Sequence, residues 1–223
     1  MNYGASEHYQ GERGQAYFAS QNQMAEKEAA VTVWKFQPWI KPTDRVLDFG
    51  CAGGWILRNL DCAERVGVEL NPEAHPVCRQ NGVNVYSWLH EVEQSGFDVA
   101  ISHHCLEHVP FPIEALKRLH SLLKDGGLMV LVVPIDDWRV EKDYTGEDID
   151  HHLHTWTPRL MANTLVEAGF RVNRVDVLTH ALFPGWSGWG RAIPRPVFDA
   201  LCRVAATMKK RRQLLAIARK GSG

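Results

Sequence analysis

The sequence has few cysteines, no long hydrophobic run and no excess of either charge. Its five cysteines are an odd number without a C-x-x-C pair, which argues against a disulfide framework. The longest apolar run, 128–133, is far shorter than the roughly 20 residues that span a bilayer. The first residues lack the basic start and apolar core of a signal peptide. We therefore expect a reduced, cytoplasmic protein.

Charge and composition narrow the class further. Lys and Arg (25) nearly balance Asp and Glu (26), so no overall field favours nucleic acid or an anionic membrane. A chain of 223 residues with 45% hydrophobic residues can bury enough surface to fold, which excludes intrinsic disorder. The length suits one large domain.

Short β-branched runs alternate with amphipathic helical patterns along most of the chain. Strands are expected at 45–49, 65–69, 83–86, 97–102, 128–133, 170–178 and 213–218, and helices at 21–40, from Gly54, after Pro72, from Pro112, from Thr157 and at 196–209. Alternation with short connections predicts an α/β fold with right-handed crossovers. The expected architecture is a doubly wound, mostly parallel, seven-stranded Rossmann-like sheet with helices on both faces, an α/β/α sandwich.

The most informative segment is the turn after the first expected strand, Val-Leu-Asp-Phe-Gly-Cys-Ala-Gly-Gly at 46–54. Its small residues let the backbone approach a ligand closely. Asp48 ends the strand, and twenty-one residues later Glu69 ends the second strand. An acid at that place accepts hydrogen bonds from both hydroxyls of a ribose. The two segments therefore predict a nucleoside site at the carboxyl edge of the sheet.

The residues of this turn disfavour a dinucleotide. The dinucleotide fingerprint G-x-G-x-x-G, counted from Gly50, places Ala52 and Trp55 where glycines are needed. Asp48 would also lie unfavourably beside a pyrophosphate, whereas an ammonium group suits it. S-adenosylmethionine has an adenosine, an α-ammonium and a sulfonium but no phosphate, and it fits these residues.

The sequence resembles class I S-adenosylmethionine-dependent methyltransferases of the broad small-molecule, type 11-like group. The resemblance covers roughly 46–178: 46–54 resembles the first motif with Ala52 for the usual middle glycine, 68–71 the ribose-binding segment, 97–109 the fourth strand and its loop, and 122–128 the turn before strand five. After strand three the family often has an acidic residue near the adenine. This chain has Ser-Trp-Leu-His at 87–90, so we expect Trp88 or Leu89 to pack on the adenine.

The resemblance implies S-adenosylmethionine as the cofactor and assigns the residues that hold it. The candidates are Tyr17, Asp48, Gly50, Cys51, Ala52, Gly54, Glu69, Leu70, Trp88, Leu89 and His103. Glu69 is expected to hold the ribose and Leu70, Trp88 and Leu89 the adenine. The aromatic N-terminal segment with Tyr9, Tyr17 and Phe18 is expected to close over the cofactor.

Two histidine clusters are candidates for catalysis. His103 and His104 follow strand four, where they are expected to flank the sulfonium, and His151, His152 and His154 follow strand five. A neutral imidazole is a suitable general base for an acceptor hydroxyl. We take His104, His152 and His154 as the catalytic candidates, with Asp136, Asp137 or Asp150 orienting the base or binding a metal with it. No metal ligand is assigned.

Two alternatives stay open at this stage. The segment His104-Cys-Leu-Glu-His108 matches H-x-x-E-H, in which Glu107 would serve a zinc hydrolase. That motif needs one helix to present both histidines, and the segment is expected to lie in a loop. The other alternative is a domain that binds S-adenosylmethionine without catalysis.

We expect a single methyltransferase domain over 1–220. It divides into an N-terminal helical lid segment (1–43), the cofactor-binding core (44–178), a loop and helix that form a lid or insertion (179–210) and the last strand (211–220). The acceptor is expected to be a small molecule, sugar or lipid-linked saccharide, methylated on oxygen, and not nucleic acid. The protein is expected to be a monomer or homodimer.

The C-terminal region has a different composition. Nine Lys and Arg and only one acidic residue, Asp199, occur between 191 and 220. Together with the Trp186 and Trp189 loop, this segment is interpreted as a lid, as a peripheral membrane contact, as a polyanion contact or as a solvated helix face.

Overall fold

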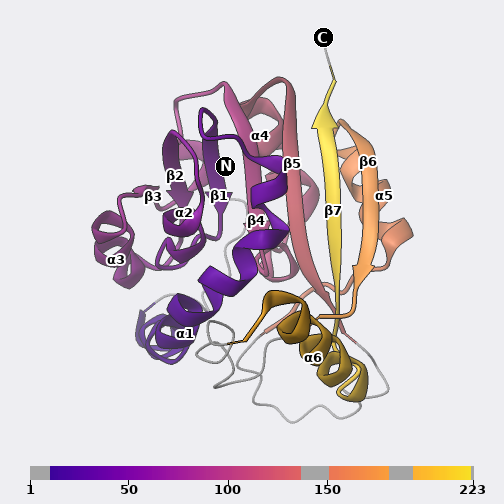
Figure 1. Cartoon of the computed structure of the whole chain (residues 1–223). Coiled ribbons are helices and arrows are strands. Elements are labelled where there is room, and N and C mark those ends of the chain that lie inside the picture. The colour runs from indigo at the N-terminus through magenta and orange to yellow at the C-terminus, as the bar shows by residue number, and fades with distance from the viewer. Residues whose placement is uncertain (1–10, 137–150, 181–192, 222–223) are drawn as a thin grey trace.

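A computed structural model describes residues 11–136, 151–180 and 193–221. They form a seven-stranded sheet of order β3-β2-β1-β4-β5-β7-β6 (Figure 1). The strands are β1 (Arg45–Phe49), β2 (Glu64–Val68), β3 (Asn84–Tyr86), β4 (Phe97–His103), β5 (Leu123–Ile135), β6 (Phe170–Leu178) and β7 (Arg212–Lys220). β7 runs antiparallel to the other six strands. The expected fold class is confirmed.

Helices cover both faces of this sheet. They are α1 (Gly11–Thr32), α2 (Trp55–Asn59), α3 (His75–Gln80), α4 (Pro112–Leu122), α5 (Pro158–Glu167) and α6 (Arg195–Met208), with short 3-10 helices η2 (Val33–Lys35), η3 (Gln37–Trp39), η4 (Pro72–Ala74), η5 (Leu89–Glu91) and η6 (Leu106–His108). Strand β5 shows why both faces are apolar: Met129 and Leu131 join the core under α4 and α5, whereas Val130 joins the core under α2 and α3. Alternate side chains of one strand thus fill two cores.

The first helix is the clearest difference from the sequence prediction. The expected helix at 21–40 is wrong at both ends, because α1 runs from Gly11 to Thr32 and is followed by η2 and η3. The β-branched run Val31, Thr32 and Val33 is a poor helix former. Pro38 then removes a backbone donor and cannot continue an α-helix. The chain instead turns tightly and delivers Lys35 and Phe36 to the interior.

Two prolines, Pro72 and Pro76, determine where the helical segments after Asn71 begin. Pro72 lies in the first turn of η4, whose N-cap Asn71 accepts a hydrogen bond from the Glu73 backbone. Pro76 lies in the first turn of α3, where its missing N–H costs nothing. The helix expected after Pro72 therefore begins as the 3-10 helix η4 and becomes α-helical at His75.

The carboxyl ends of the parallel strands meet at one edge of the sheet, and α1 and α6 lie along that edge (Figure 1). Val31 of α1 packs against Phe198 and Cys202 of α6. Ligands of open α/β sheets bind at this edge, so these two helices lie beside the expected site.

Candidate active site

The turn between β1 and α2 is possible only with small residues. Gly50 has φ +79°, and a Cβ there would lie 2.3 Å from the Cys105 Sγ. Gly54 has φ +73°, and its Cβ would lie 2.8 Å from a Val83 methyl group. Ala52, the residue that replaces the usual glycine, has φ +47°. The first motif is therefore a tight turn with the loop after β4 pressed directly against it.

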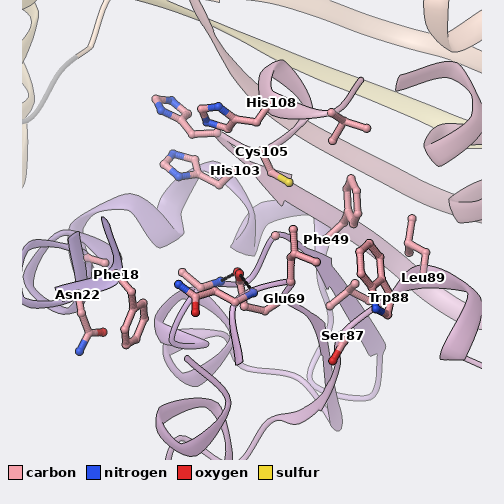
Figure 2. A pocket seen from close by; sticks show the side chains of 18 of the residues that line it. Phe18, Asn22, Phe49, Glu69, Ser87, Trp88, Leu89, His103, Cys105 and His108 are labelled. Atoms are coloured by element: carbon pink, nitrogen blue, oxygen red, sulfur yellow. Dashed lines mark hydrogen bonds between the residues drawn. The ribbon is translucent and has the colours of Figure 1, made fainter. Parts of the chain in front are cut away.

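A cavity of about 270 Å³ opens beside this turn (Figure 2). Its wall is assembled from five parts of the chain that meet at the carboxyl edge of the sheet. The lining residues are Phe18, Asn22, Ala25, Phe49, Gly50, Ala52, Val68, Glu69, Leu70, Asn71, Ser87, Trp88, Leu89, His103, His104, Cys105, His108, Val109 and Pro110. Most of this wall is apolar, and Glu69 is its carboxylate.

Glu69 is held rigidly by backbone donors. One carboxylate oxygen accepts a hydrogen bond from the Ala52 backbone (2.8 Å) and the other accepts one from the Asn71 backbone (2.8 Å). Burial raises the pKa of Glu69, and these two backbone bonds oppose the shift. An ionised carboxylate has about four acceptor positions. Glu69 can therefore accept further hydrogen bonds from two ribose hydroxyls without releasing the turn.

Asp48 lies behind the cavity wall. It is 2% exposed, and its Oδ1 has no hydrogen-bond partner among the described residues. Burial, and to a smaller degree the charge of Glu69, raises the pKa of Asp48 to about 8. A buried acceptor that lacks a donor, close to a second carboxylate, suits a cationic ligand. The α-ammonium group of S-adenosylmethionine has that charge.

The first histidine pair is linked to a buried lysine. The Nζ atom of Lys35 lies 3.2 Å from His103 Nε2 and donates to the Gln213 side chain at 2.8 Å. Burial lowers the pKa of Lys35 to about 7. Burial, and then the charge of Lys35, holds the pKa of His103 well below its usual range. His103 is therefore neutral near pH 7 and accepts the lysine hydrogen bond.

His104 stacks on His103 with the ring centroids 4.3 Å apart. Its backbone has φ +50°, an uncommon conformation for a residue with a Cβ. His104 is exposed as a whole residue, and desolvation of its ring, followed by the charge of Lys35, lowers its pKa. Both imidazoles thus face the cavity without adding positive charge.

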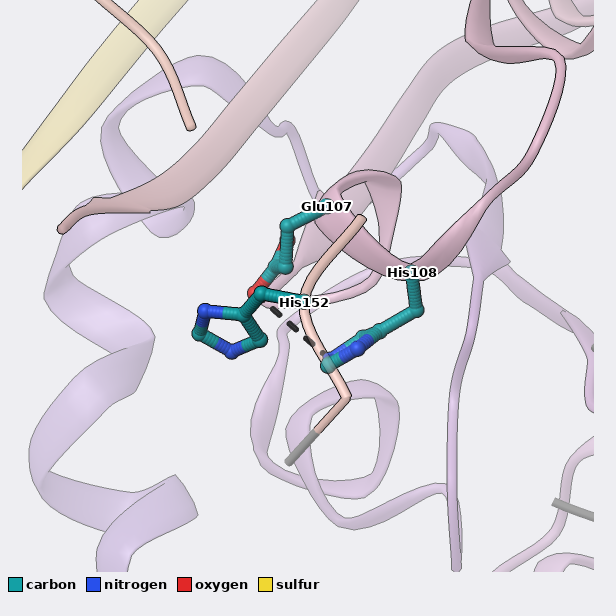
Figure 3. A group of neighbouring side chains, drawn as sticks. All are labelled: Glu107, His108 and His152. Carbon is teal, nitrogen blue, oxygen red and sulfur yellow. Dashed lines mark ion pairs between the residues drawn. The ribbon is translucent and has the colours of Figure 1, made fainter. Parts of the chain in front are cut away.

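A second cluster joins η6 to the segment after β5 (Figure 3). Ligand atoms of Glu107, His108 and His152 all lie within 4.8 Å of one another, a spacing at which they could hold a metal ion. Glu107 is fully buried and lies 3.8 Å from the His108 ring nitrogen. His152 Nδ1 lies 3.0 Å from the Asp136 carboxylate. His152 is therefore oriented by an acid.

His154 has a different environment. Its Nε2 lies 3.0 Å from the Val109 carbonyl oxygen, and its ring lies 5.8 Å from that of Trp156. The backbone N–H groups of Leu153 and His154 also donate to the Glu107 carbonyl at 2.8 and 3.1 Å. These contacts make His154 a structural link between the segment after β5 and the loop that contains η6.

The structure brings most of the predicted cofactor residues together. Those on the cavity wall are Gly50, Ala52, Glu69, Leu70, Trp88, Leu89, His103 and the catalytic candidate His104. Those that do not line it are Asp48, Cys51 and Gly54 of the first motif, and His152 and His154 of the segment after β5. The side chain of Tyr17, and Tyr9, Trp186 and Trp189 entirely, lie outside the described residues.

Several wall residues were missed by the sequence analysis. Asn22 and Ala25 follow Phe18 at steps of four and three residues, so all three lie on one side of α1. That helical spacing was the available signal. Phe49, Val68, Asn71 and Cys105 adjoin predicted residues and are placed by the ends of β1, β2 and β4.

The zinc-hydrolase alternative is not supported by this geometry. His104 follows the end of β4, and Glu107 and His108 belong to the three-residue 3-10 helix η6. The α-helix that would present both histidines to zinc is absent from this segment.

The fold and the cavity together define a class I S-adenosylmethionine-dependent methyltransferase domain. A family model described as "Methyltransferase domain" matches residues 19–175. The chain belongs to this family.

Curated relatives agree with this family. The chain is 36% identical over 99 residues to a ubiquinone biosynthesis O-methyltransferase of Xanthomonas axonopodis pv. citri, a match covering 39% of this chain and 41% of that protein. A similar match to the Ruegeria pomeroyi protein is 33% identical over 97 residues, covering 39% of each. The matches thus span about two fifths of the relatives' length.

Two solved structures show the shared fold. A methyltransferase from Methanosarcina mazei is 16% identical with a TM-score of 0.61, covering 83% of this chain and 96% of that chain. Phosphoethanolamine N-methyltransferase 2 of Haemonchus contortus, bound to S-adenosylhomocysteine, is 16% identical with a TM-score of 0.58, covering 86% of this chain and 52% of that chain. Among the described residues, no helix combines the length and apolar character needed to cross a membrane.

Proposed function

We propose that the chain transfers a methyl group from S-adenosylmethionine to an oxygen atom of a small-molecule, sugar or lipid-linked acceptor. The pairing of His152 with Asp136, at 3.0 Å and next to the cavity residue His108, is the observation that carries the oxygen assignment. The names of the curated relatives, ubiquinone biosynthesis O-methyltransferases, also support oxygen.

The described residues fit the cofactor. The turn at Gly50 leaves no room for a side chain, Glu69 offers acceptors for the ribose, and Trp88 and Leu89 offer an apolar surface for the adenine. When bound, the cofactor supplies a methyl group already activated by its sulfonium. The protein then has to align the acceptor and exclude water. His103 and His104, both neutral, avoid repelling the positive sulfur.

Removal of the acceptor proton is the step we assign to His152. Asp136 orients the His152 ring through Nδ1, and in this proposal the neutral imidazole accepts the proton of an acceptor hydroxyl at Nε2. The ring centroid of His152 lies 4.9 Å from that of His108, which lines the cavity. An acceptor beside His108 is therefore within reach of this base, directly or through one water.

The test compares His152→Ala with His154→Ala, a matched neighbour. The substrates are a panel of hydroxyl compounds, and formation of S-adenosylhomocysteine is measured. We expect His152→Ala to lower turnover by roughly 10²–10⁴-fold and His154→Ala to have a much smaller effect. Calorimetry with S-adenosylhomocysteine should give parental affinity for both variants.

Three outcomes separate the alternatives. If both variants keep parental turnover, catalysis relies on alignment alone and the base assignment is wrong. If turnover needs added Mg²⁺ or Zn²⁺ and is lost with a chelator, Glu107, His108 and His152 act as metal ligands. If the protein binds the cofactor but methylates no compound in the panel, a non-catalytic binding domain becomes the better interpretation.

A further inference from the structure

Helix α6 carries an apolar stripe that is open to solvent. Val197, Leu201, Val204 and Met208 are 51%, 43%, 58% and 80% exposed. Their spacing of four, three and four residues places all of them on one side of the helix. They make up four of the nine exposed large hydrophobic residues in the described part of the chain. A concentration of this kind on one helix marks an interaction surface.

The neighbouring side of α6 is already used within the molecule. Phe198 and Cys202 are buried and pack against Val31 of α1. The stripe is therefore an additional apolar surface beside the one that holds the helix in place. Packing within the described part of the chain does not bury this stripe.

Positive charge gathers at the end of the same helix. Lys209, Lys210, Arg211 and Arg212 follow α6 directly, and all four are exposed. The single acidic residue between 191 and 220, Asp199, lies 3.4 Å from the His180 ring. The whole chain has a formal net charge of −1, so this cationic end is a local feature.

We infer that α6 docks the protein on an anionic lipid surface. An amphipathic helix with an apolar side and neighbouring Lys and Arg residues binds in the plane of the membrane interface, through apolar burial and attraction to anionic lipids. A second copy of the chain is a poorer occupant, because two such helices would bring basic segments together without acidic partners. This inference does not depend on the identity of the methyl acceptor.

The position of α6 gives the docking a consequence for the site. α6 packs on α1, and Phe18, Asn22 and Ala25 of α1 line the cofactor cavity (Figure 1). The two helices lie along the same edge of the sheet. A molecule bound through α6 thus holds its cofactor edge near the lipid surface.

The experiment is sedimentation of the full chain with vesicles of phosphatidylcholine alone or with about one third phosphatidylglycerol. Three variants are compared with the parent: Leu201→Ser/Val204→Ser, Lys210→Gln/Arg211→Gln, and the control Val166→Ser. Val166 lies on α5 and is 61% exposed, so it matches the apolar exposure outside α6. Affinity for S-adenosylhomocysteine confirms that each variant is folded.

We expect the parent and Val166→Ser to bind the anionic vesicles, and both α6 variants to bind them at least about tenfold more weakly. Binding of the parent should fall as salt is raised and should be weak on phosphatidylcholine. The inference is overturned if the parent does not sediment with anionic vesicles, or if the α6 variants bind them as tightly as the parent. It is also overturned if the parent is a dimer that Leu201→Ser/Val204→Ser dissociates, because a second copy then occupies the stripe.

Discussion

At the scale of single residues, the cavity concentrates unusual backbone conformations. Among the described residues, four that are not glycine have positive φ, and two of them, Ala52 and His104, line the cavity. Such conformations cost roughly 1–3 kcal/mol and persist where the surrounding structure fixes them. Here the Glu69 carboxylate accepts from the Ala52 backbone, and the His104 backbone donates to the Val132 carbonyl. Hydrogen bonds to neighbouring strands thus fix both strained residues beside the site.

Gly50 offers a direct test of the turn geometry. Gly50→Ala places a Cβ 2.3 Å from Cys105 Sγ, so we expect cofactor binding to be lost and the free energy of unfolding to fall by more than the ~1 kcal/mol of a strained φ. Gly82→Ala is the control, because Gly82 also has a positive φ (+73°) but a Cβ added there would meet no atom within 4 Å. Gly50→Ala/Cys105→Gly should recover part of the binding, measured by calorimetry with S-adenosylhomocysteine. If Gly50→Ala and Gly82→Ala had equal effects on binding and stability, the predicted clash with Cys105 would be wrong.

Asp48 predicts a pH dependence of stability. Its pKa is about 8 in the folded protein, whereas an unfolded Asp titrates near 4. Between these values the folded state binds a proton that the unfolded state does not, so this contribution to stability is present below about pH 4 and is lost as the pH rises to about 8. Compared with Asp48→Asn, the parent should lose up to about 1.4 kcal/mol per pH unit in denaturant titrations across that window.

Asp98 provides a control with the opposite sign. Burial opposes the shift, but the hydrogen bond from the Arg45 backbone and the ion pair with Lys124 outweigh it and lower the pKa of Asp98. Asp98→Asn should therefore change the stability profile only at acidic pH, where the parent loses this contribution. A parent profile parallel to that of Asp48→Asn from pH 4 to 8 would show that Asp48 is ionised throughout.

At the scale of elements, hydrogen bonds from α2 and from the segment around η4 fasten α1 beside the cavity, and two of them are short. The Trp55 indole donates to the Asn22 side chain at 2.8 Å, and the Asn71 amide donates to the Gly14 carbonyl at 2.7 Å. Both partners on α1 lie far in sequence from α2 and η4. This explains how a helix of low overall amphipathicity keeps Phe18 and Asn22 on the cavity wall.

Removing one of these bonds should loosen α1. Trp55→Phe keeps the ring but removes the donor to Asn22, at a cost of about 1 kcal/mol. We expect faster amide hydrogen exchange in 11–32 and a cofactor affinity lower by roughly fivefold. The control is Arg79→Ala, an exposed substitution on the neighbouring helix α3. Unchanged exchange in α1 would show that the Trp55 bond does not hold it.

The same elements show what the sequence could and could not predict. The strands were predictable, because apolar runs such as 128–133 and the glycines after Asp48 are local signals. The course of residues 33–40 was not, because burial of Lys35 and Phe36 decided it against helical periodicity. Lys35 contacts His103, 68 residues away, and Gln213, 178 residues away. Contacts between residues this far apart in sequence depend on the folded sheet and leave no local signal in the sequence.

At the scale of the whole molecule, the antiparallel strand β7 supports the site without lining the cavity. It pairs with β5 over eight positions and separates β5 from β6. Its first residues lie at the carboxyl edge, so Gln213 reaches the Lys35 and His103 pair. The chain reaches β7 from β6 through α6, which lies along that edge. The last strand therefore connects directly to α6, the surface proposed for lipid docking, and begins at the edge of the sheet where the cavity lies.

The whole molecule should be stabilised by its cofactor product through Glu69. At about 100 times its Kd, S-adenosylhomocysteine should contribute ~2.7 kcal/mol, which corresponds to a Tm increase of about 5–10 °C for a domain of this size. Glu69→Gln keeps the shape but weakens charge-assisted hydrogen bonds worth about 1.5–3 kcal/mol, so at the same ligand concentration the increase should fall to half or less. Glu93→Gln, an exposed substitution nearby in sequence, should keep the full increase. Differential scanning calorimetry measures all three proteins with and without ligand. A full increase in Glu69→Gln would exclude Glu69 from ribose binding, because the ligand would then be held without the carboxylate.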